Sequence, residues 1–263
     1  MQGRLSPQST RGYQVFPWDS WEEEFTLAAE RGLEHIEWVV DSWRTNDNPL
    51  LTTPSLVSKT IADTGVRVIT VCADYLMDRP LDINQEQTWS TLLPLLEAMQ
   101  VLGAHWLILP CVDQSSLQSS AALDRFKRAS VKLAGKVADT GIRVSLETDL
   151  PPDSYRRLLA ELDPQTFSVN YDIGNSASLG FSLDAEFDSY EQRISVVHLK
   201  DRPFGGESVP LGRGDAKIAR AIDRLLALDF NGPVTMQAFR DLEGVEVLDR
   251  QLIWIQDQLE RRV

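Results

Sequence analysis

Four stretches of the chain repeat one pattern of polar and apolar positions, in which an amphipathic segment ends at a glycine and a run of apolar residues follows. The closest pair is ADTGVRV at Ala62–Val68 and ADTGIRV at Ala138–Val144, and looser copies centre on Gly32 and Gly103. Glycine is the residue best suited to the left-handed conformation that ends a helix. Each copy therefore predicts a helix that leads into a buried strand.

The spacing of these glycines predicts how the elements connect. They lie 33, 38 and 38 residues apart, and a strand with its returning helix needs roughly 30 or more residues. Short connections between alternating strands and helices give parallel strands with right-handed crossovers. Eight apolar runs are the expected strands: Arg4–Leu5, Ile36–Val39, Val68–Cys72, Leu107–Leu109, Val144–Leu146, Phe167–Tyr171, Ile194–Leu199 and Val234–Gln237. Seven segments are the expected helices: Trp21–Arg31, Thr53–Thr64, Glu86–Leu102, Ala121–Thr140, Tyr155–Leu162, Ala216–Leu228 and Leu248–Arg261.

This order of elements predicts the fold class. Eight strands in 263 residues indicate a (β/α)8 TIM barrel that occupies residues 1–263 as a single domain, with a doubly wound open sheet as the alternative. Such barrels commonly form one unit of about 250 residues. No linker or low-complexity stretch divides the chain, and the stretch Arg202–Pro210, rich in proline and glycine, is expected to be a loop after the seventh strand.

Composition agrees with a folded protein and narrows its partners. The chain is 43% hydrophobic and 25% charged, which is ordinary for a globular domain and excludes disorder, collagen and coiled coil. Its 39 acidic and 26 basic residues give a formal charge of −13. A charge of this sign repels phosphate backbones and anionic lipid, so we expect no nucleic-acid or membrane partner.

The two cysteines and the start of the chain bear on its location. Cys72 and Cys111 lie in apolar runs without CxxC spacing, which favours reduced, buried thiols over disulfides or a zinc knuckle. The opening stretch Met1–Pro7 contains no apolar run, and no segment approaches about 18 consecutive apolar residues. We therefore expect no signal peptide, no membrane span and a cytoplasmic location.

Polar residues follow most of the predicted strands, at the point where each strand ends. The strand ends of a barrel converge on one mouth, where the chemistry of such folds gathers. The polar strand-end residues are Glu37, Asp74, Asp113, Glu147, Asp172, His198, Lys200 and Gln237. Carboxylates, an imidazole and an amide at the ends of apolar strands are typical of a metal site.

Four of these residues form an ordered set. Glu147, Asp172, His198 and Gln237 are separated by 25, 26 and 39 residues, so successive strands each contribute one ligand. Oxygen and imidazole donors without thiolate suit one divalent ion, Mn²⁺, Mg²⁺, Co²⁺ or Zn²⁺, and the sequence does not choose among them.

Each residue taken singly also has a structural interpretation. An acidic residue at a strand end is often the N-cap of the next helix. His198 lies in an otherwise apolar run and alone is better read as a hydrogen-bonded core histidine. His35 and His105 fall at strand starts, which is the face of the barrel that serves stability, so no chemistry is assigned to them. The order of the four residues together favours the metal site.

Four segments resemble the xylose-isomerase-like TIM barrel family of sugar phosphate isomerases and epimerases. They are SLET at Ser145–Thr148, NYDIGN at Asn170–Asn175, VHLKDR at Val197–Arg202 and PLGRGD at Pro210–Asp215. The last two are quite specific as a pair, whereas the first two are weak in isolation. The resemblance spans most of the chain and implies the same barrel.

The resemblance also implies a ligand set. In the family a Glu, an Asp, a His and a final Glu bind one divalent metal, and the first three correspond to Glu147, Asp172 and His198. Gln237 stands at the place of the final glutamate. Epimerases of the family use the first and last glutamates as an acid/base pair, and a glutamine can ligate through its oxygen but cannot transfer a proton. One-base proton shuttling by Glu147 remains open.

Further residues receive roles from the same resemblance. Asn175 stands where the family often has a histidine that contacts substrate. Lys200 and Arg202 are expected to face the mouth and hold a carboxylate or phosphate, and Lys200 is an alternative base. Arg213 either adds a second clamp or is a solvated surface charge. The carboxylates of Glu37 and Asp74 are expected to bind substrate hydroxyls.

These residues predict a metal-dependent isomerase or epimerase. The metal would chelate the carbonyl and a neighbouring hydroxyl of a small keto sugar, sugar phosphate or hydroxy-keto acid, and stabilise an ene-diolate. A dehydratase or lyase on the same barrel and a sugar-binding protein that has lost catalysis remain alternatives. A barrel endonuclease needs several more histidines than the three present. Exposed apolar helix faces are common in barrels, which leaves a homodimer open.

Overall fold

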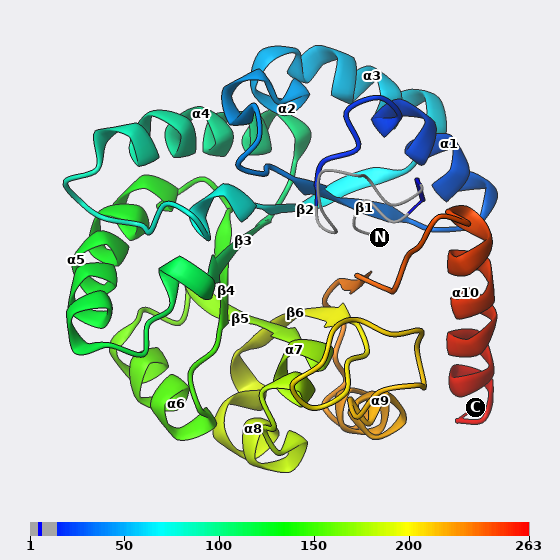
Figure 1. Ribbon diagram of the computed structural model, residues 1–263. Coiled ribbons are helices and arrows are strands. Elements are labelled where there is room, and N and C mark those ends of the chain that lie inside the picture. Colours follow the sequence, from blue (N-terminus) through cyan, green and yellow to red (C-terminus); the bar gives the residue numbers. More distant parts are fainter. Residues whose placement is uncertain (1–4, 7–14, 263) are drawn as a thin grey trace.

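Seven parallel strands, paired in chain order, form one sheet that curves into a nearly closed barrel (Figure 1). The computed structural model describes residues 5–6 and 15–262. The strands are β1 His35–Val39, β2 Arg67–Cys72, β3 Trp106–Cys111, β4 Arg143–Thr148, β5 Phe167–Asp172, β6 Ile194–Leu199 and β7 Val234–Met236. The predicted TIM barrel is confirmed, and its strands follow one another without a switch of order.

The expected strand Arg4–Leu5 falls at the edge of what the structure describes. Arg4 lies outside the described residues, and Leu5 lies in a bend with its side chain buried in the core. Seven of the eight expected strands are therefore confirmed by the described part of the chain.

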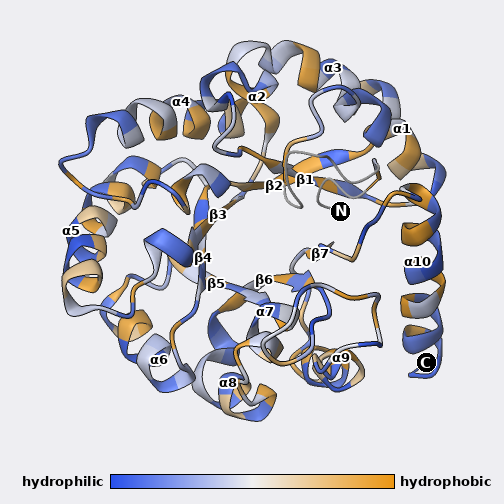
Figure 2. Ribbon diagram, in the orientation of Figure 1, coloured by the Kyte–Doolittle hydropathy of each residue, from blue (hydrophilic) through white to orange (hydrophobic). Residues whose placement is uncertain are grey.

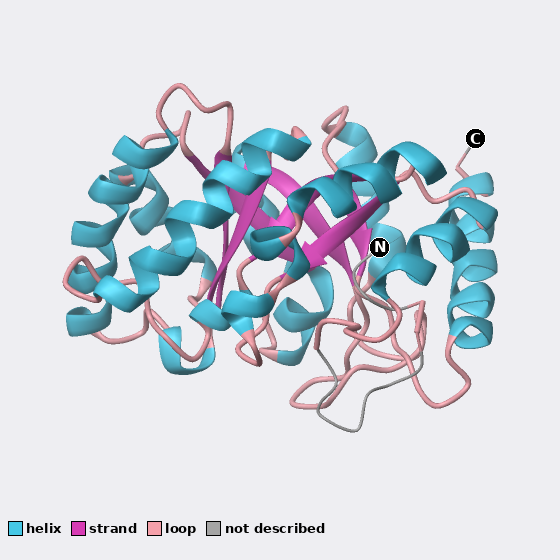
Figure 3. Cartoon of the chain, turned by 90° about the horizontal axis from the view of Figure 1, so that it is seen from above, coloured by secondary structure: helices cyan, strands magenta, loops and turns pink. Residues whose placement is uncertain are grey.

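Helices surround the barrel, and Figure 3 shows the strands enclosed by them. All seven expected helices are confirmed: α1 Trp21–Glu30, α3 Pro54–Thr64, α4 Glu86–Leu102, α5 Ser120–Val137, α6 Pro152–Glu161, α9 Ile218–Ala227 and α10 Val245–Glu260. Three further helices were not expected: α2 Pro49–Thr52, α7 Ile173–Ser178 and α8 Leu183–Tyr190. The last two fill the connection between β5 and β6, next to the ends of those strands.

The repeated pattern predicted that a helix ends at a glycine, and the structure confirms this for two helices. Gly65 (φ 74°) follows α3 and Gly103 (φ 69°) follows α4, both in the left-handed conformation. The phrase at Gly141 differs, because α5 already ends at Val137 and Asp139 adopts a left-handed turn (φ 62°) before the glycine. The prediction placed that helix end three residues too late.

Burial of the strands explains why they read as apolar runs. All six residues of β5 are buried, and the residues of β3 after Trp106 are buried as well. The surrounding helices are amphipathic, and α9 buries Ile218, Ala221, Ile222 and Leu225. Figure 2 accordingly shows both polar and apolar residues on the outer helices. One continuous core lies between the helices and the sheet.

The structure also bears on the predictions about the two cysteines and about membrane spans. Cys72 and Cys111 are both buried and free, as expected. Within residues 5–6 and 15–262, no helix has the length and apolar character that a membrane crossing requires.

Candidate metal centre and mouth pocket

The residues predicted to bind metal come from the carboxyl ends of neighbouring strands. Glu147 lies near the end of β4, Asp172 ends β5, and His198 lies one residue before the end of β6. Asp172 and His198 face each other across the β5–β6 ladder. Gln237 follows β7 directly. The parallel register therefore brings residues that are far apart in sequence to one end of the barrel.

Three of these side chains form a compact cluster. The ligand atoms of Glu147, Asp172 and His198 all lie within 4.8 Å of one another, and all three residues are buried. The imidazole Nδ1 of His198 is 3.4 Å from Glu147 Oε2 and 3.9 Å from Asp172 Oδ2. Two carboxylates and an imidazole are hard and borderline donors of the kind that hold a divalent cation.

One carboxylate oxygen of this cluster accepts no hydrogen bond from the part of the chain that the structure describes. Asp172 Oδ2 is buried without a hydrogen-bond partner among the described residues, although Lys200 Nζ lies 3.5 Å away. The other oxygen, Oδ1, accepts the backbone N–H of Asn175 at 2.8 Å and so caps α7. The capping interpretation is confirmed for one oxygen of Asp172, and the other oxygen is available to the predicted metal. A divalent cation fits this oxygen, because a buried carboxylate oxygen that accepts no hydrogen bond is costly.

Two amides fix the carboxylate of Glu147. Asn170 Nδ2 donates to Oε2 and Asn175 Nδ2 donates to Oε1, each at 2.8 Å. Burial alone would raise the pKa of Glu147, but the hydrogen bond and charge of His198, together with Lys200 and the Asn175 amide, lower it below its usual value. The carboxylate is therefore ionised and held in one orientation, as a metal ligand or a positioned base requires.

His198 is held from below by a second carboxylate. Its Nε2 lies 2.9 Å from Glu37 Oε1, and both side chains are inaccessible to solvent. Burial lowers the pKa of His198, but Glu37 and Glu147 outweigh it and raise that pKa to about 10. Contact of one ring nitrogen with Glu37 leaves Nδ1 facing Glu147 and Asp172. A carboxylate behind a ligating histidine commonly fixes the ring in this way.

Lys200 lies beside the cluster in a space that a glycine provides. Its Nζ donates to Gln237 Oε1 at 2.7 Å. A Cβ atom on Gly174 would lie 2.8 Å from Lys200 Cγ and 2.9 Å from its carbonyl carbon, which is too close. Gly174 in the NYDIGN segment thus allows Lys200 to pass over the start of α7. Gly174 was part of the motif found in the sequence, but its contact with Lys200 could be seen only in the folded structure.

A pocket of about 430 Å³ opens above these residues. Its lining brings together seven of the predicted site residues: Asp74, Glu147, Asp172, Asn175, Lys200, Arg202 and Gln237. It also includes Asp113 and Asp149, and only the first was noted as a polar strand-end residue. The pocket lies at the carboxyl ends of the strands, where active sites of barrels occur.

Three predicted residues do not line this pocket. His198 and Glu37 lie beneath its floor, fully buried. Arg213 is exposed in the loop between β6 and α9. That loop is held by Asp201, whose buried carboxylate accepts the backbone N–H groups of Gly212 and Gly214 at 2.8 and 2.9 Å. The aspartate of the HLKD motif therefore explains the glycines of the following motif, as an anchor for the loop.

Arg202 contacts the cluster through Asn175. Its Nη1 donates to Asn175 Oδ1 at 2.8 Å, and its Nε donates to the carbonyl oxygen of Gly206 at 2.9 Å. Because Asn175 in turn donates to Glu147, the guanidinium orients the amide that orients the carboxylate. Asn175 thus binds protein groups on both sides of its amide.

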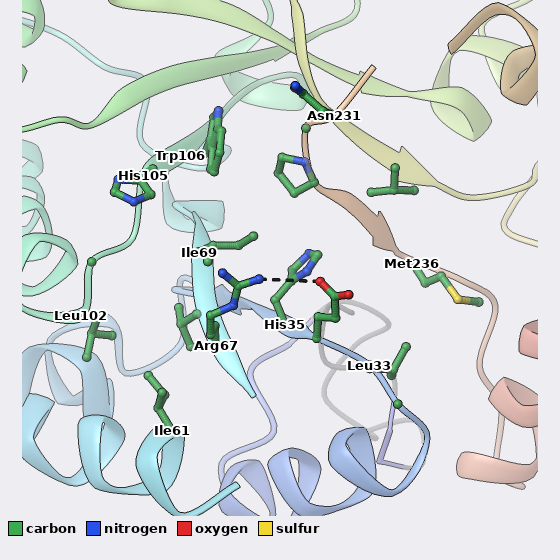
Figure 4. Close-up of a pocket in the computed structure, with 17 residues that line it drawn as sticks. Leu33, His35, Ile61, Arg67, Ile69, Leu102, His105, Trp106, Asn231 and Met236 are labelled. Carbon is green, nitrogen blue, oxygen red and sulfur yellow. Dashed lines mark ion pairs between the residues drawn. The ribbon is translucent and has the colours of Figure 1, made fainter. Parts of the chain in front are cut away.

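A larger cavity of about 620 Å³ lies at the opposite end of the barrel, where the strands begin. Figure 4 shows His35, His105 and Arg67 among its lining residues, with an ion pair between Arg67 and Glu34 at 3.6 Å. Burial and the nearby Arg67 lower the pKa of His35 to about 3. This end holds no cluster of metal ligands among the described residues.

The chain belongs to the xylose isomerase-like TIM barrel family, whose sequence pattern matches residues 25–258. The family match, the barrel and the strand-end donors agree with one another. The resemblance predicted from the four motifs is therefore confirmed.

Two curated relatives are, by name, epimerases of phosphorylated compounds. The chain is 28% identical over 173 residues to the 2-epi-5-epi-valiolone 7-phosphate 2-epimerase of Actinoplanes sp. (strain ATCC 31044 / CBS 674.73 / SE50/110), covering 64% of this chain and 63% of that protein. It is 23% identical over 257 residues to the putative L-ribulose-5-phosphate 3-epimerase of Escherichia coli (strain K12), covering 88% and 87%. The chain thus spans less than two thirds of the first relative.

Solved structures show the same fold. A xylose isomerase-like TIM barrel protein from Mycobacterium smegmatis, in complex with magnesium, superposes with a TM-score of 0.71. It shares 17% sequence identity, and the match covers 97% of this chain and 93% of that one. This likeness concerns the fold.

Proposed function

We propose that the protein is a divalent-metal-dependent isomerase or epimerase that acts on a small keto sugar, sugar phosphate or hydroxy-keto acid. The observation that carries the proposal is the buried cluster of Glu147, Asp172 and His198 under the mouth pocket, in which Asp172 Oδ2 accepts no hydrogen bond from the described residues. The names of the two curated relatives support the class of reaction.

Glu147, Asp172 and His198 are the residues that would hold the metal, with Gln237 Oε1 as a fourth donor. A divalent cation at this place supplies Lewis acidity, which polarises a carbonyl and lowers the pKa of the adjacent C–H group. Around the cluster the three carboxylates of Glu37, Glu147 and Asp172 outnumber the single ammonium of Lys200, and a metal ion would take the place of the Nδ1 proton of His198. The surplus of negative charge favours a cation.

The chain itself provides the proton transfer. Glu147 is ionised and held by two amides, so it can take the proton from the carbon beside the carbonyl and return it to the next carbon. Return to the next carbon is isomerisation, and return to the same carbon from the other face is epimerisation. Gln237 cannot carry a proton in the second case.

Lys200 is the second group proposed to carry a proton. It is buried beside the pocket and donates to Gln237 Oε1, the residue that stands at the place of the second glutamate of a two-base epimerase. Placed there, its ammonium can also hold the substrate oxygen on which negative charge develops. Asn175 and Arg202 keep Glu147 in place from the other side.

Exchange with solvent deuterium tests the proposal. The protein is loaded with Mn²⁺ and incubated in D₂O with a series of ketoses and ketose phosphates, and proton NMR follows the C–H group beside the carbonyl. We expect loss of that signal together with formation of an aldose or an epimer. A product that has lost water and absorbs in the ultraviolet would instead support a dehydratase. No exchange with any compound would support a binding protein without catalysis.

A Gln237→Glu variant tests the number of bases. Restoring the carboxylate would give the site a second proton carrier in the last position. We expect the ratio of epimer to aldose to rise in this variant, measured by NMR on the same substrate. An unchanged ratio would contradict a role of Gln237 in the choice between the two products.

A further inference from the structure

A second buried carboxylate group, outside the metal cluster, lies where β5, α7 and α8 meet. Glu186 of α8 is 2% exposed. Its Oε1 accepts hydrogen bonds from the hydroxyl groups of Ser176 and Tyr190, each at 2.7 Å, and its Oε2 accepts one from Tyr171 at 3.0 Å. No ion pair among the described residues involves Glu186. Three hydroxyl groups therefore replace the water that this carboxylate loses on burial.

Two of the three donors are direct neighbours of site residues in the chain. Tyr171 precedes Asp172 at the end of β5, and Ser176 follows Asn175 in α7. The third donor, Tyr190, belongs to α8 like Glu186, so its hydrogen bond stays within that helix. The hydrogen bond from Ser176 is therefore the one by which Glu186 holds α7.

The helix α7 depends on contacts with the rest of the protein. It has six residues, Ile173–Ser178, of which only Ile173 is a buried large apolar residue. A helix of this length is not stable by itself in water. Its last residue, Ser178, accepts the backbone N–H of Gly205 at 2.9 Å and donates its hydroxyl to the carbonyl oxygen of Gly206 at 3.2 Å. In Figure 1, α7 lies on the barrel side of α8, and Ser176 supplies the hydrogen bond between the two helices.

The position of α7 sets the geometry of the proposed catalytic groups. The backbone N–H of Asn175 donates to Asp172 Oδ1, and its side-chain amide donates to Glu147 Oε1, both at 2.8 Å. Gly174 packs closely against Lys200. A shift of α7 would therefore turn the carboxylate of Glu147, and a small misplacement of a catalytic group costs much of the rate.

We infer that Glu186 is a positioning residue for the reaction at the mouth. It fixes α7 through Ser176, and α7 holds the carboxylate of Glu147 through the amide of Asn175. Glu186 does not line the mouth pocket, so its effect on the reaction passes through these residues. This inference rests on the proposed function, in which Glu147 is the base.

A Ser176→Ala variant tests the link between the two helices. It removes the hydrogen bond to Glu186 and leaves that carboxylate its two tyrosine donors. At saturating Mn²⁺ we expect kcat to fall about tenfold and KM to change by less than about twofold, because the base is turned while the pocket is kept. Ser176→Thr keeps the hydroxyl group and should recover most of the lost kcat. Ser130→Ala is the matched control, since it removes a buried hydroxyl group that bonds only within α5, and it should leave kcat unchanged.

A double-mutant cycle separates an effect through Glu186 from a contact of Ser176 with substrate, since Ser176 also lines the pocket. Glu186→Leu removes the acceptor and should lower kcat about as much as Ser176→Ala. Both changes together should lower kcat no further, because they break the same hydrogen bond. Glu186→Gln keeps one oxygen for Ser176 and should retain most of kcat.

The side-chain amide of Asn175 reports the same link without substrate or metal. Its signals in ¹⁵N-labelled, metal-free protein are identified by their loss in Asn175→Ala. We expect them to shift in Ser176→Ala, because the hydrogen bond to Glu147 is disturbed, and to keep their wild-type positions in Ser130→Ala. This readout does not require turnover.

The outcomes separate this inference from the proposed function. Wild-type kcat in Ser176→Ala, with or without a loss of stability in urea, would overturn the inference and leave the isomerase proposal standing. A rise in KM alone, or losses that add in the double variant, would overturn it as well. Absence of conversion by the wild type would contradict the isomerase proposal, and unshifted Asn175 signals in Ser176→Ala would then overturn the inference. If Glu186→Leu does not fold, the results for Ser176→Ala and Ser176→Thr decide by the same criteria.

Discussion

The two ends of the barrel each carry a histidine beside a cavity, and the charges around the two histidines act in opposite directions. His198 at the mouth contacts Glu37 and lies near Glu147, and its pKa is raised to about 10. His35 at the base contacts Thr235 at 3.3 Å and lies near Arg67, and its pKa is lowered to about 3.

This difference shows what makes one end a candidate active site. Both histidines are largely withdrawn from water, and the larger cavity is the one at the base. Within the part of the chain that the structure describes, only the mouth combines an imidazole with carboxylates at the ends of neighbouring strands. Cavity size and the presence of histidine therefore do not identify the site, whereas the cluster of opposite charges does.

Substitution of Glu147 should have the largest effect. Glu147→Gln keeps the shape of the side chain and removes both its charge and its basicity, so we expect kcat to fall by about 10²- to 10⁴-fold. His105→Gln at the base is the control and should leave kcat unaltered. The measurement is NMR-detected deuterium exchange of the best ketose. Equal losses in both variants would contradict the assignment of the chemistry to the mouth.

Substitution of Glu37 tests the support beneath His198. Glu37→Gln removes the charge that holds the imidazole, and we expect Mn²⁺ affinity to fall by about 10- to 100-fold while the protein stays folded. Titration followed by electron paramagnetic resonance measures the affinity, and circular dichroism checks the fold. Glu34→Gln, which removes the partner of Arg67 at the base, should leave Mn²⁺ binding unchanged. An unaltered affinity in Glu37→Gln would show that the ring needs no such partner.

Substitution of Gly174 tests the role of Lys200 in catalysis independently of metal binding. A methyl group at this position would displace Lys200, and we expect a loss of kcat of about tenfold with metal content retained. Gly135→Ala is the matched control, because nothing lies near the added atom and α5 should gain about 0.5–1 kcal/mol of stability. The two effects are measured by kcat and urea unfolding. Full activity of Gly174→Ala would remove Lys200 from the mechanism.

A separate effect concerns the pH dependence of the free energy of unfolding, which depends on His35 at the base of the barrel. The pKa of His35 is lowered from 6.5 to about 3 by folding, so between these values the unfolded chain binds a proton that the folded chain does not. Stability is therefore lost as the pH falls through this window, by up to about 1.4 kcal/mol per pH unit. Urea unfolding at several pH values should show a shallower loss in His35→Gln. The same slope in both proteins would contradict the account of His35.

The sequence predicted most of the fold because its signals are local. The glycines at positions 65 and 103 mark helix ends through their own backbone conformation, and the strands read as apolar runs because both faces are covered. The helix α7 was missed, since Asp172 both ends a strand and caps that helix with no loop between them. Such a junction leaves no turn residues to detect.

Parts of the site depend on the barrel itself and were beyond a reading of the chain. Glu37 was expected to bind substrate, but it lies in the middle of β1, below His198. Its distance from the mouth depends on the stagger of the strands, which the sequence does not show. Arg213 and Asp201 were both visible in their motifs, yet only the folded loop shows that one is exposed and the other anchors it. The role of Gly174 likewise required the position of Lys200.

Metal content tests the central claim most directly. The protein is purified without chelator, exposed to Mn²⁺ or Zn²⁺, desalted and analysed by mass spectrometry, beside a Glu147→Gln/His198→Ala variant and a His35→Gln variant. The account predicts about one divalent ion per chain in the wild type and in His35→Gln, and none in the double variant. A wild type that retains no metal after exposure, or a double variant that retains as much as the wild type, would contradict it.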